Sequence, residues 1–319
     1  MANVLKFWKK TAIQTAAAAV ILVVFQSLIS TGAFNQYYTR VLITICINIM
    51  LALSANLIIN ISGQLTLGHT AFMAIGAYAA AVMSMHAHLP FFFALLAGGL
   101  VAAFFGLLIG LPTLRLKGDY LAITTLGFCQ IVVVAFQNIN FLGGAQGLTG
   151  IPYKTNFMWV YVSMVVMIFL LYNLVHSRHG RAMISVREDE IAAQSMGINT
   201  TRYKIMAFTV GAFFAGFAGG LYAHLMMYIE PNSFNFMQSV NVVIFVVLGG
   251  AGGIIGCMTS TTLLTLLQEA LRPLGGLDMV IYPFLLIVIM LLRVKGSGLS
   301  GIFGRFTKLL RKPNAQGGK

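Results

Sequence analysis

Charge is scarce in this sequence. Only 8% of its 319 residues are Asp, Glu, Lys or Arg, and 59% are hydrophobic. A soluble domain carries about a quarter charged residues. With so few charges the chain cannot cover a surface that faces water, so the composition predicts a polytopic membrane protein.

Cysteine is scarce too. Cys46, Cys129 and Cys257 each fall within an apolar run, and none has the spacing of a metal-ligand set or a disulfide framework. We interpret them as packing residues. The sequence therefore predicts no metal site and no cofactor.

The parts of an energy source are missing as well. No G-x-x-x-x-G-K-[ST] phosphate loop occurs, so the chain is not expected to hydrolyse ATP by itself. None of the seven acids is predicted at mid-membrane, where ion-driven carriers place their relay groups. Serine-hydrolase and H-E-x-x-H zinc patterns are also absent, so no catalytic residues are predicted. What remains is a pore-forming subunit whose energy comes from a partner.

Long apolar runs are what the sequence has instead. A transmembrane helix needs about 20 mainly apolar residues, and the sequence predicts an all-α polytopic fold of about ten such helices, some broken by glycine, with about eight as the lower bound. The first run follows a basic N-terminus without a clear cleavage site, so it is expected to be a retained span rather than a signal peptide. The predicted spans are 11–30, 38–59, 67–86, 90–111, 119–138, 157–175, 205–228, 239–253, 254–271 and 279–293.

Basic residues set the orientation. With a cytoplasmic N-terminus, 17 of the 20 Lys and Arg residues fall on the cytoplasmic side, as the positive-inside rule favours. Both termini are therefore predicted in the cytoplasm, and the net charge of +13 reflects topology rather than nucleic-acid binding. The predicted organisation is a cytoplasmic N-terminus (1–10), a transmembrane domain (11–293) with a cytoplasmic loop (176–204), and a basic cytoplasmic tail (294–319) lying on the anionic inner leaflet.

Residues 187–204 form a polar island between two predicted spans. A charged segment held at the water surface suits docking to a soluble partner. The alternative is an ordinary solvated loop helix. Three of the seven acids of the chain follow one another here: Glu188, Asp189 and Glu190.

Local signals predict one short helix within this island. Ser185-Val-Arg-Glu188 fits the S-x-x-E capping box, and Gly197 is a natural left-handed terminator. The helix is expected from Val186 to Met196. The side chains expected to share one of its faces are Ala192, Ala193 and Met196.

Two segments interrupted by glycine, 62–69 and 248–253, lie in the two halves of the chain. In transporters, such broken apolar segments point to the translocation path. The alternative is close helix packing, which is the interpretation for Gly106/Gly110 and Gly216/Gly220. The candidate path residues are Gly63, Gln64, Thr66, His69, Gly249 and Gly250.

At the polar island the chain resembles the membrane permeases of ABC importers, whose cytoplasmic coupling loop carries the pattern E-A-A-x-x-x-G. Ala192, Ala193 and Gly197 match, but Ile191 occupies the glutamate position and Glu190 precedes it. The wider string 187–204 closely resembles the permeases of high-affinity branched-chain amino-acid importers of the LivM type. Further matches, between about residues 40 and 293, are Asn60–Tyr78, Gly118–Gly127, Gly147–Pro152 and Val247–Gly253.

The resemblance implies a permease for leucine, isoleucine and valine in a bacterial cytoplasmic (inner) membrane. It also implies a second homologous permease, two ATP-binding subunits and a periplasmic or extracellular substrate-binding protein as partners. Two alternatives stay open: a related permease for urea or short amides, and a stand-alone secondary carrier. The residues expected to couple to the ATPase are Glu188, Glu190, Ala192, Ala193, Met196 and Gly197.

Overall fold

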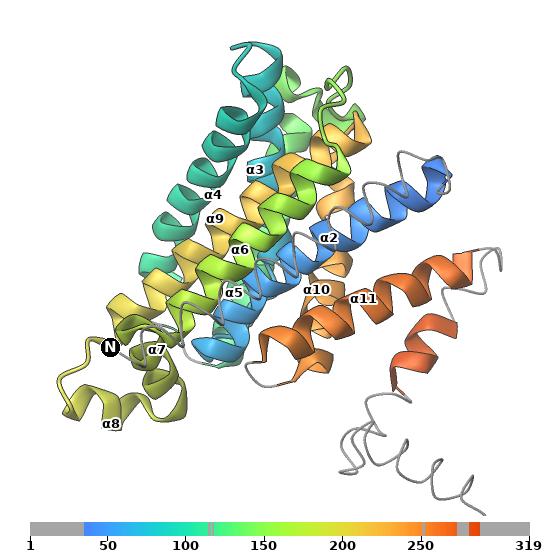
Figure 1. Cartoon of the computed structure of the whole chain (residues 1–319). Helices are drawn as coiled ribbons and strands as arrows, with labels where there is room; N and C mark the ends of the chain where they lie inside the picture. Colours follow the sequence, from blue (N-terminus) through green and yellow to red (C-terminus); the bar gives the residue numbers. More distant parts are fainter. Residues whose placement is uncertain (1–34, 114–115, 117, 251–252, 273–280, 288–319) are drawn as a thin grey trace, which may run out of the picture. The chain divides into compact units, whose positions relative to one another are not determined.

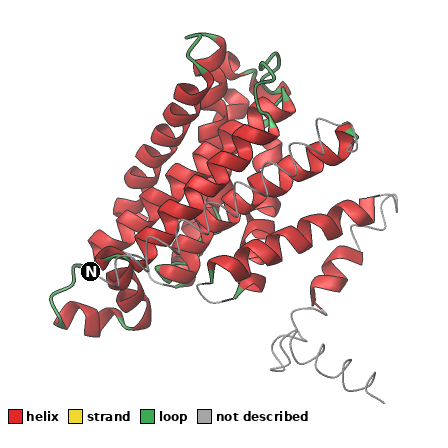
Figure 2. Cartoon of the chain, in the orientation of Figure 1, coloured by secondary structure: helices red, strands yellow, loops and turns green. Residues whose placement is uncertain are grey.

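The computed structural model describes residues 35–113, 116, 118–250, 253–272 and 281–287. Helices and loops make up nearly all of this part of the chain (Figure 2), and an antiparallel bridge joins Leu148 to Ile229. The chain divides into two units, residues 1–263 and 264–319, which are described separately. The predicted first span, the basic tail and most of the predicted last span lie outside the described residues.

The helices follow the predicted spans closely. Among the described residues, seven helices are long and apolar enough to cross a membrane, and the shorter helix at His69–Met85 is also apolar. The all-α polytopic prediction is thereby confirmed for the described residues. The helices are α2 (Gln36–Asn56), α3 (His69–Met85), α4 (Phe91–Thr113), α5 (Asp119–Asn138), α6 (Phe157–His176), α7 (Arg178–Glu188), α8 (Glu190–Ser195), α9 (Thr200–Met226), α10 (Phe236–Gly249) and α11 (Ile254–Leu271), with a π-helical turn η1 (Leu57–Ile61) and short 3-10 turns η2 (Asn140–Leu142), η3 (Gly144–Gln146) and η4 (Pro231–Phe234).

Small residues allow three helices of the first unit to pack closely. In α3, α4 and α9, which pack side by side (Figure 1), a Cβ added at Gly106 would lie 2.6 Å from Cβ of Ala212, and one at Gly220 would lie 2.8 Å from Cδ2 of Leu95. A Cβ at Gly76 would collide with the backbone of Gly216. Within a bilayer no hydrophobic effect drives helices together, so van der Waals contact at close backbone approach stabilises their association. The packing interpretation is confirmed for Gly106, Gly216 and Gly220.

The two ends of the first unit differ in character. The α6–α9 connection folds into α7 and α8 at one end, whereas the α3–α4 connection and the loops that follow α5 lie at the other (Figure 1). The described part of the second unit comprises the end of α11 and residues 281–287, and it contains an ion pair of 3.1 Å between Arg272 and Glu269. The candidate site lies in the first unit.

Candidate functional site

The polar island contains the last two residues of α7, the whole of α8 and the first residues of α9, with a sharp break between α7 and α8. Asp189 is extended, with φ −155° and ψ 110°, and it separates α7 from α8. The Asp189 carboxylate accepts hydrogen bonds from the backbone N–H groups of Ile191 (2.9 Å) and Ala192 (3.0 Å), so it is the N-cap of α8. The prediction of one helix from Val186 to Met196 is wrong.

The predicted capping box is also wrong, because Ser185 and Glu188 have other partners. The Ser185 hydroxyl donates to the Ala182 carbonyl at 2.8 Å inside α7, and Glu188 pairs with its neighbour Arg187. Because Met183 and Val186 are buried, α7 runs through Ser185 and begins earlier, after its N-cap Ser177. Packing of this apolar face thus outweighs a local capping signal.

The predicted terminator of the helix is confirmed. Gly197 has φ +80°, a left-handed conformation that a glycine adopts without strain. The N–H of Ile198 donates to the Ala193 carbonyl (3.0 Å) and the N–H of Gly197 to the Gln194 carbonyl (2.9 Å), which is the Schellman arrangement. Both ends of α8 are therefore fixed, one by Asp189 and the other by Gly197.

One side of α8 is exposed and partly apolar. Ile191 is 73% exposed and Met196 is 82% exposed. Ala193 is buried, so the structure separates it from Ala192 and Met196, with which it was expected to share a face. We call the exposed side the α8 outer face, comprising Ile191, Ala192, Ser195 and Met196.

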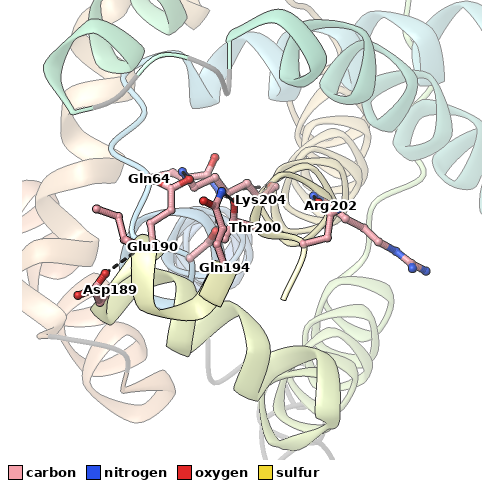
Figure 3. Close-up of polar contacts among 10 residues, drawn as sticks. Gln64, Asp189, Glu190, Gln194, Thr200, Arg202 and Lys204 are labelled. Atoms are coloured by element: carbon pink, nitrogen blue, oxygen red, sulfur yellow. Dashed lines mark hydrogen bonds and ion pairs between the residues drawn. The ribbon is translucent and has the colours of Figure 1, made fainter. Parts of the chain in front are cut away.

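Glu190 turns inward from this face. Its Oε1 lies 2.7 Å from Nζ of Lys204 on α9, and the two side chains are only 26% and 13% exposed. Gln194 Nε2 also donates to the hydroxyl of Thr200 at 3.1 Å. Figure 3 shows these four residues gathered between α8 and the first turns of α9. They anchor α8 to α9.

The first glycine-interrupted segment is a true break between two helices. α2 passes into the π turn η1, residues 62–68 leave helical geometry, and α3 begins at His69. We call residues 57–68 the α2–α3 break. The Gln64 side chain is 3% exposed, and its Nε2 donates to Ser62 Oγ (2.6 Å) and to the Lys204 carbonyl (3.3 Å). Gln64 Oε1 has no hydrogen-bond partner among the residues that the structure describes.

The other candidate path residues have distinct surroundings. Gly63, with φ +73°, is exposed, and a Cβ there would lie 2.8 Å from Cγ of Arg187. Thr66 and His69 are fully buried, and His69 Nε2 hydrogen-bonds with the Ser54 hydroxyl at 2.7 Å. The structure therefore brings Gly63 and Gln64 toward α7 and α9, and turns Thr66 and His69 into the helix core.

The second glycine-interrupted segment touches the first. The Asn60 side-chain amide donates to the Gly250 carbonyl at 3.1 Å, just beyond the end of α10. A Cβ at Gly249 would lie 2.6 Å from Cα of Cys257, so this glycine allows α10 and α11 to pack closely. Of the pair, Gly250 faces the break, whereas Gly249 serves packing.

Two further residues of this site escaped the sequence interpretation. Arg187 Nη1 donates to the Asn60 carbonyl at 2.6 Å, and Lys204 contacts Glu190 with its side chain and Gln64 with its carbonyl. In the sequence, both residues count only among the basic residues that predict the cytoplasmic side. The position of Lys204 could have indicated a contact, because it lies in the first turns of α9, within reach of the preceding short helix α8.

The comparisons with known proteins point to one family. The family described as "Branched-chain amino acid transport system / permease component" matches residues 37–294. The high-affinity branched-chain amino acid transport system permease protein LivM of Salmonella typhimurium is 34% identical over 315 residues, which cover 88% of this chain and 73% of that protein. Its counterpart LivM of Escherichia coli is 35% identical over 285 residues, which cover 78% of this chain and 67% of that protein. LivH, another permease protein named for the same system in Escherichia coli, is 31% identical over 151 residues, 46% of each chain. No solved structure matches significantly.

Proposed function

The chain belongs to the family of permease components of branched-chain amino-acid transport systems, and on this premise we propose that it moves leucine, isoleucine and valine into the cell. It is a LivM-type multi-pass membrane subunit of an ABC transport system and not itself an ATPase. The observation that carries the proposal is the likeness to two LivM proteins over most of the chain, together with a family match whose range, residues 37–294, contains the polar island.

The proposed assembly contains this chain, a second permease, two ATP-binding subunits and an extracytoplasmic substrate-binding protein in a bacterial inner membrane. The partial likeness to LivH supports a paired, homologous permease. The charge asymmetry of the loops supports a cytoplasmic position for α7 and α8, because the island and its flanks hold five basic residues.

We propose that the α8 outer face docks on an ATP-binding subunit. Ile191 and Met196 expose large apolar surfaces that a partner groove can cover, and burying one such side chain contributes about 1.5–3 kcal/mol. The caps at Asp189 and Gly197 hold the face in one shape before docking, which lowers the entropic cost of association. Ile191 takes the position that the generic coupling motif gives to glutamate. An apolar contact in this protein thus replaces an acidic one.

The translocation path is proposed to run beside the α2–α3 break and the end of α10. Broken helices with non-helical backbone are the usual lining of such paths. Gly63, Gln64 and Gly250 lie at the junction of the two segments, which supports their place near the path. The support for Thr66, His69 and Gly249 is weaker, since these residues are engaged in packing or in buried hydrogen bonds.

Reconstitution into liposomes tests the proposed function. The complex purified through a tag on this chain is expected to take up labelled leucine only when ATP and the substrate-binding protein are both supplied. Urea and acetamide form the second arm of the assay, and their uptake in place of leucine would overturn the substrate assignment. Leucine uptake by the chain alone, driven by an ion gradient, would overturn the transporter class.

A further inference from the structure

We propose that Glu190, Lys204 and Gln64 form a positioning link that transmits movement of α8 to the α2–α3 break. The inference rests on the proposed function of α8 as the docking helix. It assigns to these three side chains a role inside the subunit, separate from contact with the ATPase.

The first contact of the link joins α8 to α9. The ion pair between Glu190 and Lys204 spans 2.7 Å, and both side chains are mostly covered. Water and salt screen a covered ion pair less than an exposed one. With Glu190 in the first turn of α8, a displacement of this helix acts directly on Lys204.

The second contact joins α9 to the break. The Lys204 carbonyl accepts from Gln64 Nε2 at 3.3 Å, and Gln64 is 3% exposed. A carbonyl oxygen can only accept, so the nitrogen of the amide must face Lys204. One residue thus holds α8 through its side chain and the break through its backbone, as Figure 3 shows for Gln64, Lys204 and Glu190.

A parallel contact from α7 reaches the same segment. Arg187 Nη1 donates to the Asn60 carbonyl at 2.6 Å, and the stem of Arg187 packs against Gly63. The Asn60 amide in turn donates to the Gly250 carbonyl at 3.1 Å. The two short helices therefore hold the break at separate points, and the break touches the end of α10.

The break is suited to adopt a second arrangement. It combines a π turn with non-helical residues, so fewer regular backbone hydrogen bonds hold it than hold a continuous helix. Gln64 Oε1 is buried without a hydrogen-bond partner among the described residues, and an unmet buried acceptor is unfavourable. A rearrangement that gives this oxygen a hydrogen-bond donor would remove that free-energy cost. Movement of α8 can then select between two arrangements of the segment.

The test compares a lysine substitution with an arginine substitution on α9, each made in the complete complex in liposomes. Lys204→Met removes the link. Arg202→Met is the matched control, because Arg202 lies two residues away, is exposed, and points away from α8 in Figure 3. The measured quantities are ATPase subunits retained per permease, ATP hydrolysed, and leucine taken up per ATP hydrolysed.

Lys204→Met and Glu190→Gln are expected to retain the ATPase subunits and ATP hydrolysis while leucine uptake per ATP falls at least about fivefold, the lower end of typical coupling between sites. Lys204→Arg and the exchanged pair Glu190→Lys with Lys204→Glu are expected to restore most of the ratio. If Lys204→Met lowers the amount of folded protein, Gln64→Leu tests the second contact with the same readout.

Equal leucine-to-ATP ratios in Lys204→Met and Arg202→Met would overturn the link. Loss of the ATPase subunits in Lys204→Met would also overturn it, because the residue would then serve docking rather than transmission. Failure of the unaltered chain to retain any ATPase subunit would instead remove the proposed function. The two ideas therefore fail on different measurements.

Discussion

At the scale of the residue, Glu190 and Ile191 are neighbours with opposite surroundings. The acid is held inside by Lys204, whereas the apolar side chain that follows it is 73% exposed. Spacing along the sequence could not predict this difference, because the partner of Glu190 lies fourteen residues later on another helix. The identity of the terminator Gly197, in contrast, was predictable because its conformation depends only on local backbone geometry.

Replacement of Ile191 by serine is expected to weaken association with the ATP-binding subunit by about tenfold or more, since about 1.5–3 kcal/mol of apolar burial is lost. Affinity is measured by titrating the purified ATPase onto the permease in nanodiscs. Leu116→Ser is the control, because Leu116 is an exposed apolar residue of another predicted cytoplasmic loop. Identical affinities for Ile191→Ser and the unaltered chain would refute docking through the α8 outer face.

At the scale of the element, the sequence specified the spans better than the loop between them. Long apolar runs determined α5 and α11 at the predicted residues, because hydrophobic length is a strong signal. Ser177 and Asp189 cap the two short helices in place of the predicted box at Ser185, because burial of Met183 and Val186 carries α7 through Ser185. That burial is a tertiary effect that local patterns do not contain.

The terminator of α8 gives a prediction at this scale. Gly197→Val places a β-branched side chain at φ +80°, a strained conformation that costs on the order of 1–3 kcal/mol. The end of α8 is expected to fray and ATPase association to fall, while membrane insertion stays normal. Gly197→Asn is the control, since asparagine tolerates the left-handed region and no atom lies within 4 Å of a Cβ there. Pull-down of the ATPase measures the effect, and equal recovery with valine and asparagine would count against it.

At the scale of the whole molecule, the long-range contacts are what the sequence could not supply. The two glycine-interrupted segments were predicted separately, but their junction through Asn60 and Gly250 joins residues 190 positions apart. Composition and charge bias are summed over the chain, so they predicted the membrane class and an orientation. Pairwise contacts between helices depend on how side chains fit at each crossing, and they cannot be deduced by inspecting a single sequence.

The orientation has a direct test. Cysteine introduced at Met196, which is 82% exposed, is expected to react with a membrane-impermeant maleimide only after the inner face of the membrane is opened. Cysteine at Tyr153, 53% exposed in a predicted outer loop, is expected to react in spheroplasts with intact membranes. The native thiols Cys46, Cys129 and Cys257 are buried and leave a low background. Labelling in the reverse order would invert the proposed topology.

The central claim is that α8 connects this permease to the subunit that hydrolyses ATP. The most direct measurement is cross-linking from a cysteine at Met196 with a short bifunctional reagent in the assembled complex, followed by identification of the linked chain. The proposed docking of α8 predicts a high yield of cross-link to an ATP-binding subunit and none from a cysteine at Tyr153. Absence of that cross-link in a complex that still transports leucine with ATP would contradict the account.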